Sequence, residues 1–208
     1  MKKTIWKTLG ICLLVLAAAA MLCACGGKKK DISGSYIATY NMKEALNKQL
    51  EESGMAIESD VNADFILNLN ADNTFSFDID GAGFGANFAE VMKSDGPAII
   101  NSMLEAEGIT EDMYETIAAA SGYDSYDAFV EDVVGTIVSE MGEEFVGELE
   151  SGVHYEGSYS LDKNIITLDG EVNEEKGMDQ GTLNEDGTIS ITSKMEDGTE
   201  LNLTFTKE

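Results

Sequence analysis

Residues 64–80 read DFILNLNADNTFSFDID, and this stretch decides the architecture that the rest of the chain is expected to follow. Apolar residues recur at every second position in 65–69 and again in 75–79. A period of two is that of a β-strand with one apolar and one polar face. The triplet Ala71-Asp72-Asn73 between the two runs has the composition of a turn. The stretch therefore predicts an antiparallel hairpin with one buried face.

The same period of two occurs near both ends of the chain, on either side of a long helical block. Further strands are expected at 34–40, 153–161, 164–168, 178–183, 188–194 and 200–206. Asp-Gly pairs in the loops between the later strands are typical of hairpins, because glycine readily adopts positive φ. The acidic segment 169–177 is expected to be a loop. About eight strands in sequence order favour an α+β fold built on an up-and-down barrel, which leaves no exposed edge.

Two helical regions are expected between the first four strands. A short polar helix over 42–52 would follow the first strand. After the third strand, Gly81-Ala82-Gly83-Phe84-Gly85 is interpreted as a flexible joint. A helix marked by apolar residues from 88 to 104 would come next, and Gly96-Pro97 would break or kink it. A short helix over 110–120, with Thr110 at its cap, completes the first part of the block.

The strongest helical pattern lies between Tyr126 and Leu149. Apolar residues recur there at spacings of three and four, and acidic residues largely occupy the remaining positions. This pattern predicts an amphipathic helix of about 25 residues. Asp124 or Ser125 would cap its start, and Ser151-Gly152 would end it.

The first thirty residues have the organisation of an export signal. Lys2, Lys3 and Lys7 supply positive charge, and no charged residue occurs from Leu9 to Cys25. A basic region followed by an apolar region is typical of signal peptides. The apolar run is somewhat shorter than the roughly 20 residues that a membrane-spanning helix needs.

The end of this run, Leu22-Cys23-Ala24-Cys25, resembles the lipobox of bacterial lipoproteins. The resemblance implies cleavage between Ala24 and Cys25, and a diacylglycerol on the Cys25 thiol that holds the chain at the membrane. An ordinary secretory signal and an uncleaved anchor are the alternatives. Residues 1–24 would then be a lipoprotein signal peptide, 25–31 a lipidated, lysine-rich tether, and 32–208 a single domain.

Composition limits the partners of the expected domain. Beyond Lys30 there are seven lysines, no arginine and all thirty-nine acidic residues, a difference of −32. Nucleic acid is excluded as a partner, because phosphate binding requires a basic patch. Lys28-Lys29-Lys30 could contact anionic headgroups or serve only as a solvated tether. The mature chain would keep Cys25 as its one cysteine, which leaves no disulfide and no thiolate site.

Short motifs in the strands resemble those of lipocalin-like bacterial domains. Ser33-Gly34-Ser35-Tyr36 is similar to their opening strand, with tyrosine in place of tryptophan. Gly157-Ser158-Tyr159 and Gly181-Thr182-Leu183 are similar to their later hairpins. The resemblance implies an apolar small-molecule site inside the barrel. The helical block, at about 85–150, would be an insertion between the third and fourth strands that the family pattern lacks.

Residues that could support catalysis or metal binding are scarce. His154, the one histidine, is interpreted as a solvated or hydrogen-bonded strand residue, because a zinc site or a catalytic triad needs more partners. Asp78-Ile79-Asp80-Gly81 resembles a calcium loop only briefly, since Ala89 stands where a bidentate glutamate belongs. We therefore expect no enzyme activity, no metal and no cofactor.

The methionines of the mature chain have two interpretations. Methionine fills irregular parts of a core and also lines adaptable binding surfaces. The residues concerned are Met42, Met55, Met92, Met103, Met113, Met141, Met178 and Met195. The sequence as a whole predicts an extracytoplasmic lipoprotein, anchored to the cell membrane, that binds a small hydrophobic ligand. The alternative is a structural or interaction lipoprotein with a filled barrel and an envelope protein as its partner.

Overall fold

The computed structural model describes residues 30–50, 56–172, 175–194 and 200–208. These residues form eight strands, which close into one antiparallel barrel in sequence order. The strands are β1 Gly34–Asn41, β2 Asn62–Leu69, β3 Thr74–Ile79, β4 Tyr155–Asp162, β5 Ile165–Val172, β6 Glu175–Leu183, β7 Ile189–Lys194 and β8 Glu200–Lys207. The predicted barrel of about eight strands is confirmed. Closure between β1 and β8 pairs Tyr36 with Lys207.

The helices occupy the two intervals where the sequence predicts them. Helix α1, Lys43–Leu50, follows β1. The second interval holds α2 Gly81–Ala106, the 3₁₀ turn η2 Glu111–Met113, α3 Tyr114–Ala120 and α4 Tyr126–Val153. All four of these elements lie between β3 and β4 in the chain. The described residues contain no helix that is both long and apolar enough to cross a bilayer.

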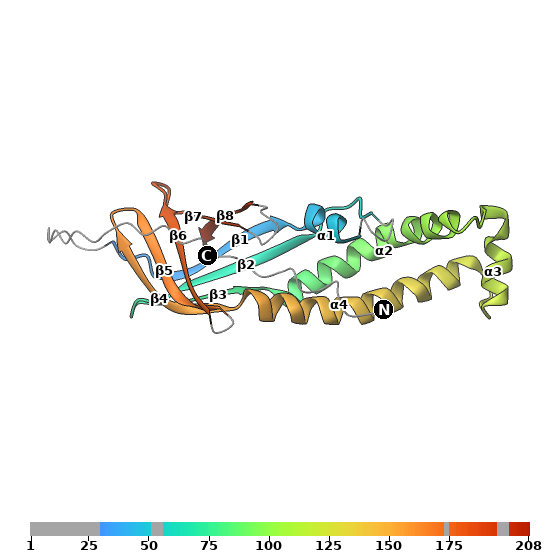
Figure 1. Cartoon of the computed structure of the whole chain (residues 1–208), viewed down its shortest axis with the longest axis horizontal. Coiled ribbons are helices and arrows are strands. Elements are labelled where there is room, and N and C mark those ends of the chain that lie inside the picture. The colour runs from blue at the N-terminus through green and yellow to red at the C-terminus, as the bar shows by residue number, and fades with distance from the viewer. Residues whose placement is uncertain (1–29, 51–55, 173–174, 195–199) are drawn as a thin grey trace. The chain divides into compact units, whose positions relative to one another are not determined.

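The chain divides into two compact units (Figure 1). The barrel unit comprises the described residues up to Thr39, together with Asp64–Ile79 and Leu149–Glu208. The helical unit comprises Tyr40–Ala63 and Asp80–Glu148. Each unit has its own buried apolar side chains, and the two are described separately below.

The buried side chains of the barrel unit are apolar and come from all eight strands. Burial alternates along the strands, as expected for a pleated sheet with one covered face, although on β4 only Tyr155 is fully buried. Phe77 on β3 meets Phe205 on β8 with ring centroids 5.9 Å apart, although these strands are not neighbours in the barrel. Side chains therefore meet across the interior at this level. The buried residues are Tyr36, Ala38, Phe65, Leu67, Leu69, Phe75, Ile79, Tyr155, Ile166, Leu168, Leu183, Ile189, Ile191, Leu201, Leu203 and Phe205.

Two turns of the barrel have the same structure. Asn70-Ala71-Asp72-Asn73-Thr74 joins β2 to β3, and Asn184-Glu185-Asp186-Gly187-Thr188 joins β6 to β7. In each turn the aspartate accepts hydrogen bonds from the backbone N–H and the hydroxyl of the threonine two residues later. The residue between them has positive φ, 67° at Asn73 and 90° at Gly187. This local hydrogen bonding fixes the turn and hence the register of each hairpin.

The same hydrogen bonds explain the acidity of both turn aspartates. The side-chain hydrogen bond from Thr74, followed by its backbone hydrogen bond, holds the pKa of Asp72 below its ordinary value. At Asp186 the backbone hydrogen bond from Thr188 is the larger cause of the lowered pKa, and the hydroxyl adds to it. Both turns are therefore formed with charged carboxylates.

The rims of the barrel separate the N-terminal segment from the helical connections. Every strand pair from β2 around to β1 is antiparallel, so odd-numbered strands begin at the rim where even-numbered strands end. We call the rim at which β1 begins the anchor rim. There Lys207 Nζ donates to the Ser33 carbonyl oxygen at 2.6 Å, and the buried Tyr36 hydroxyl donates to the Ile32 carbonyl oxygen at 2.8 Å. The connections to α1, α2 and α4 all leave from the opposite rim.

Three local predictions are wrong. Residues 81–85 are the first turns of α2 and not a flexible joint, because the Asp80 side chain accepts from Gly83 N–H at 2.9 Å and caps the helix. Helix α2 then continues through Pro97 to Ala106. Helix α4 also continues past Ser151-Gly152, and the backbone N–H of His154 donates to the Glu150 carbonyl oxygen. Val153 is therefore helical, and β4 begins only at Tyr155.

The third error concerns residues 169–177, which were expected to form a loop. β5 extends to Val172 and β6 begins at Glu175, while 173–174 lie outside the described residues. Gly157 pairs with Gly170, and a Cβ built on Gly157 would lie 2.2 Å from the Asp169 carbonyl oxygen. The glycines permit a close approach between β4 and β5, and backbone pairing holds a segment whose side chains are mostly polar.

Helices α2 and α4 run side by side in the helical unit, and α3 lies across their ends (Figure 1). Gly96 on α2 faces Val134 on α4, where an added Cβ would lie 2.7 Å from a valine methyl group. Gly85 likewise faces Val146. Ser125 caps α4 by accepting from Ala128 N–H at 3.2 Å, which confirms one of the two predicted caps. The buried residues of this unit include Phe84, Phe88, Val91, Met92, Ile99, Ile100, Tyr114, Ala118, Val130 and Val134.

Asp95 fixes the segment before β2 to helix α2. Its carboxylate accepts from the backbone N–H groups of Glu58 and Ser59 at 2.8 and 2.7 Å, and from the Ser59 hydroxyl at 2.7 Å. Burial is the largest single influence and would raise the pKa of Asp95. The hydrogen bonds from Ser59, Glu58 and Ser94 together outweigh it and lower the pKa. The helical unit is thus held partly by one charged side chain.

Candidate functional site

The most distinctive cluster of side chains in the helical unit lies where α2 ends and α4 begins. We call this region, residues 101–132, the tip. It contains η2, α3 and three of the chain's tyrosines. The contacts of these tyrosines join the end of α2, η2, α3 and the start of α4.

Asn101 is the centre of the tip. The Tyr126 hydroxyl donates to Asn101 Oδ1 at 2.6 Å, and the Tyr114 hydroxyl lies 3.5 Å from the Asn101 carbonyl oxygen. The two tyrosine rings stack with centroids 4.5 Å apart and an interplanar angle of 24°. Stacked tyrosine rings bury apolar surface, and their hydrogen-bonded hydroxyls fix the orientation of each ring. The end of α2 is therefore joined to the starts of α3 and α4 through one asparagine.

A second aromatic pair extends the tip along α4. Tyr123 meets Phe129 edge to face at 5.5 Å, and its hydroxyl donates to Asp132 Oδ2 at 2.6 Å. The backbone N–H of Tyr126 also donates to Glu115 on α3, at 3.3 Å. These contacts hold the connection between α3 and α4 in one conformation.

The tyrosine hydroxyls of the tip are neutral donors at physiological pH. Burial, followed by the charges of Glu105 and Glu111, raises the pKa of Tyr114. Burial is also the main cause of the raised pKa of Tyr126. At Tyr123 the hydrogen bond to Asp132 comes first, ahead of burial, in raising the pKa. The charge of the tip therefore comes from its carboxylates alone.

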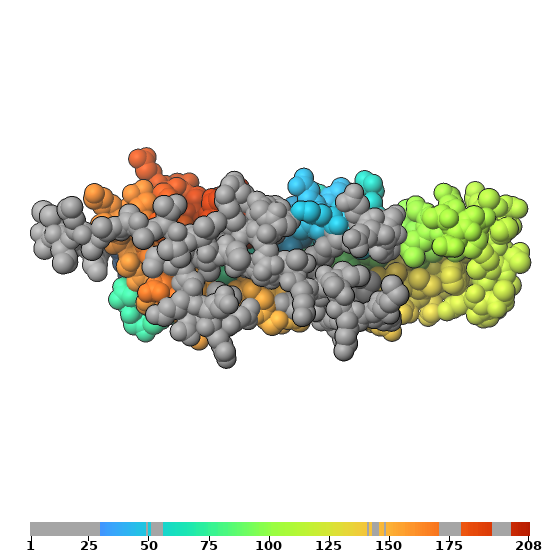
Figure 2. Space-filling view, viewed as in Figure 1, coloured from blue at the N-terminus to red at the C-terminus, as the bar shows by residue number. Residues whose placement is uncertain are grey.

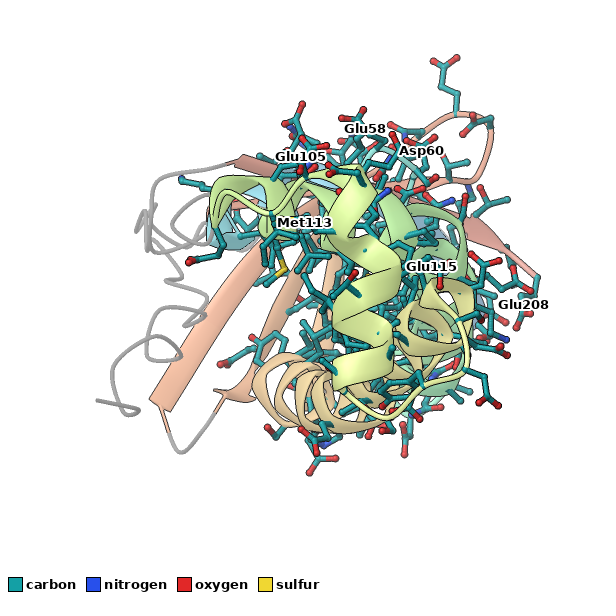
Figure 3. The ribbon with its side chains drawn as sticks, turned by 90° about the vertical axis from the view of Figure 1, so that its right-hand side faces the viewer. Glu58, Asp60, Glu105, Met113, Glu115 and Glu208 are labelled. Atoms are coloured by element: carbon teal, nitrogen blue, oxygen red, sulfur yellow. The ribbon has the colours of Figure 1, made fainter. Side chains whose placement is uncertain are left out.

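Those carboxylates are numerous, and lysine and arginine do not accompany them. Residues 94–153 contain fifteen aspartates and glutamates and no lysine or arginine. Seen from the α3 end, carboxylates such as that of Glu105 project outward from the ribbon (Figure 3). The surface of η2, α3 and the start of α4, drawn in yellow-green, lies open on the face shown in Figure 2. The exposed acidic residues of the tip are Glu105, Glu107, Glu111, Asp112, Glu115, Asp124, Asp127, Glu131 and Asp132.

Two large apolar side chains are exposed in the same region. Met103 is 45% exposed and Met113 is 38% exposed. Among the side chains that the structure describes, Ile165 in the barrel unit is the only other large apolar one exposed to this degree. Met42 and Met92 are buried, as core filling predicts, and the side chains of Met141 and Met178 are not described. Met55 and Met195 lie outside the described residues.

His154 directly precedes β4, so its prediction as a strand residue is wrong, but it has a hydrogen-bond partner, Asp78, in the barrel unit. Its Nδ1 lies 2.6 Å from Asp78 Oδ1, and its Nε2 lies 3.8 Å from Glu156 Oε2. The histidine side chain is 54% exposed and the Glu156 side chain 72% exposed. No group of three or more His, Cys, Asp or Glu residues in the described part of the chain is arranged to hold a metal ion.

The residues of the calcium-like stretch have other partners. Asp78 pairs with His154, whereas Asp80 caps α2 through Gly83. The two carboxylates therefore have different partners and do not form a shared cation site. Cys25, the predicted lipidation site, lies outside the described residues.

The interior of the barrel unit is the other candidate site. Phe77 belongs to the inward face of β3, between the buried Phe75 and Ile79, yet it is only half-buried. It stacks on Phe65 at 5.8 Å and meets the fully buried Phe205 edge to face. The interior is thus apolar and closely lined at this level, with one ring partly accessible.

Comparison with known proteins gives no further guide to the site. No protein-family model matches the chain, and no curated protein matches its sequence. The tip was not singled out from the sequence, although a signal was present. The sixty residues without lysine or arginine, together with three tyrosines between 114 and 126, could have indicated it.

Proposed function

We propose that this chain is a non-enzymatic lipoprotein of the cell envelope whose helical unit binds a basic protein partner. The diacylglycerol on Cys25 holds the chain at the extracytoplasmic face of the membrane. The observation that carries the proposal is the uncompensated charge of residues 94–153, fifteen acidic residues without lysine or arginine. Such a surface attracts basic partners and repels anionic ones.

The topology of the barrel unit supports the same function. The N-terminal segment enters at the anchor rim, whereas α1, α2 and α4 are connected to the barrel at the opposite rim. The described chain before β1 and the connections to the acidic helices therefore lie at opposite ends of the strands. Contacts of Phe77 with Phe65 and Phe205 inside the barrel favour a scaffold over a large ligand cavity.

The partner is tested by site-specific photo-crosslinking in intact cells. A photoreactive residue in place of Glu107 should give a discrete adduct, and the same residue in place of Asp162 on the barrel should not. Identification by mass spectrometry should show a partner with a basic surface. Adducts at both positions alike, or at neither, would contradict the proposal.

A pair of charge variants provides the control for this experiment. Removing four negative charges at the tip should abolish the adduct, because the attraction depends on local charge. Removing four charges from the barrel should leave it unchanged. The tip variant is Glu105→Gln, Glu107→Gln, Glu111→Gln and Glu115→Gln; the barrel variant is Asp162→Asn, Asp169→Asn, Glu185→Gln and Glu208→Gln.

The anchor is tested by the mass of the mature amino terminus. We expect a terminal peptide that begins at Cys25 and carries a diacylglycerol. Cys25→Ser should remove the modification and release the chain from the membrane, whereas Cys23→Ser should change neither. An unmodified terminus upstream of Cys25 would show an ordinary or uncleaved signal instead.

Binding of a small hydrophobic ligand in the barrel is the second candidate function. The half-buried Phe77 on the inward face of β3 is the observation that favours it. An acyl chain that enters there would contact Phe65 and Phe205, both buried. Saturable uptake of a fluorescent fatty acid, weakened by Phe77→Ala but not by the exposed Thr204→Ala, would support this function. Uptake that does not saturate would exclude it.

A further inference from the structure

Two exposed methionines, Met103 and Met113, occur in the tip together with the exposed Glu105 and Glu111. We call these four residues the methionine corner. Met103 follows the buried Ile99 and Ile100 by four and three residues on α2. It therefore continues the apolar stripe of that helix beyond the part that is covered. Met113 directly precedes Tyr114 in the chain. The Tyr114 hydroxyl lies 3.5 Å from the carbonyl oxygen of Asn101, and Asn101 precedes Met103 by two residues.

The corner is supported by ordered structure. The Met113 backbone N–H donates to the Thr110 carbonyl oxygen at 2.8 Å, and Ile109 N–H donates to the Leu104 carbonyl oxygen at 2.9 Å. Tyr114, which follows Met113, is 5% exposed and stacks on Tyr126. The methionines thus extend from a fixed base, while their own side chains remain adaptable. A fixed base lowers the entropy lost when a partner binds.

Charge limits what can cover the corner. Glu105 follows Met103 by two residues and Glu111 precedes Met113 by two, so each methionine has an acidic residue near it in the chain. Both glutamates are exposed, as are Glu107 and Asp112. A second copy of this chain would bring the same negative charges together, and an anionic lipid surface would be repelled. An occupant that matches both features has apolar side chains for the methionines and lysine or arginine for the glutamates.

We propose that the methionine corner binds an amphipathic, basic segment of the partner protein. This inference rests on the proposed function and adds the place and the chemistry of recognition. Apolar side chains of the segment would cover Met103 and Met113, and its cationic groups would pair with Glu105 and Glu111. Methionine-lined surfaces accept such segments because their side chains repack around different apolar shapes.

Two synthetic peptides of about fourteen residues test the inference, each with the same number of lysines. The first places leucines along one helical face, and the second has serine in place of each leucine. Fluorescence anisotropy would measure their binding to the mature chain with Cys25→Ser, which presents no detergent or bilayer to the peptides. We expect the leucine peptide to bind about tenfold more tightly at physiological salt.

The variants Met103→Gln and Met113→Gln, combined, should remove this preference, since glutamine keeps the side-chain length and adds no charge. Ile165→Gln replaces the exposed apolar residue of the barrel unit and should leave the preference intact. Thermal unfolding followed by circular dichroism would confirm that both variants fold. A preference that survives the double variant, or that Ile165→Gln removes equally, would overturn the inference.

The outcomes separate this inference from the proposed function. If both peptides bind equally, charge alone attracts the partner, so the inference fails and the proposed function stands. If neither binds, basic segments are not recognised and both fail. Self-association, or binding to zwitterionic vesicles, that is lost in the double methionine variant would assign the corner to another occupant and overturn the inference.

Discussion

The barrel unit and the helical unit bury their apolar side chains in different ways. Each strand of the barrel pairs on both sides, and the inward side chains cover one another. Two long helices have no comparable closure, and the apolar stripe of α2 ends with Met103 45% exposed. Among the described side chains the barrel unit exposes one large apolar residue, Ile165, whereas the helical unit exposes two, Met103 and Met113, both at its tip. Burial, and not composition alone, distinguishes the two.

The largest effect is expected for Phe205→Ala in the barrel unit. Phe205 is fully buried and meets Phe77 across the interior, so truncation leaves a cavity. We expect the free energy of unfolding to fall by about 3–5 kcal/mol. The neighbouring Thr204 is exposed, and Thr204→Ala should cost less than about 0.5 kcal/mol. Chemical denaturation measures both, and similar small costs would show that the interior is not filled at this level.

An intermediate effect is expected at Asp95 in the helical unit. Asp95→Asn removes the charge from a side chain with three hydrogen bonds, which should cost about 1–3 kcal/mol at neutral pH. Because the folded pKa of Asp95 lies below its ordinary value of 3.8, the stabilisation is complete above the unfolded pKa. It is lost as pH falls through the folded pKa.

Unfolding measured by helical circular dichroism from neutral pH down to acid would test this dependence. The difference between wild type and Asp95→Asn should shrink below about pH 4. Asp127→Asn, at an exposed position on α4, is the matched control and should have a small effect. A difference that stays constant with pH would show that Asp95 acts through shape and not through its charge.

The smallest effect is expected where α2 meets α4. Gly96→Ala should gain about 0.5–1 kcal/mol of helix propensity but push a Cβ against Val134. We expect a net loss of about 1 kcal/mol, because overpacking costs more than the propensity supplies. In a double-mutant cycle, Val134→Ala should relieve the clash and give a measurable coupling energy. Stabilisation by Gly96→Ala without coupling would mean that the helices do not pack at this point.

Much of the fold could be predicted because its elements have clear periodicities. Residues 64–80 show the hairpin directly, and the apolar positions of 126–149 predict most of α4. Prediction failed at 81–85, where glycines conceal a helix start fixed by Asp80. It also failed at 169–177, where strand pairing depends on a backbone approach between Gly157 and Gly170. At 81–85 the conformation depends on the cap from the neighbouring Asp80. At 169–177 it depends on pairing with β4, which is distant in the sequence from the end of that segment.

The candidate site was harder to predict than the fold. Tyr114 and Tyr126 follow the helical pattern like other core residues, and nothing local shows that they meet at Asn101. From the sequence, Met103 and Met113 could either fill the core or line a binding surface, like the other methionines. Their exposure distinguishes them from Met42 and Met92, and exposure depends on which helices cover each position.

The amino-acid sequence by itself determined the period of each strand and helix, the uncompensated negative charge of 94–153, and the chemistry of the turns at Asp72 and Asp186. These are local properties, set by side chains and their immediate neighbours. Only the tertiary structure decided that Phe77 meets Phe205 and that the tyrosines converge on Asn101. It alone also decided that two methionines remain exposed, because burial depends on residues brought together from distant parts of the chain.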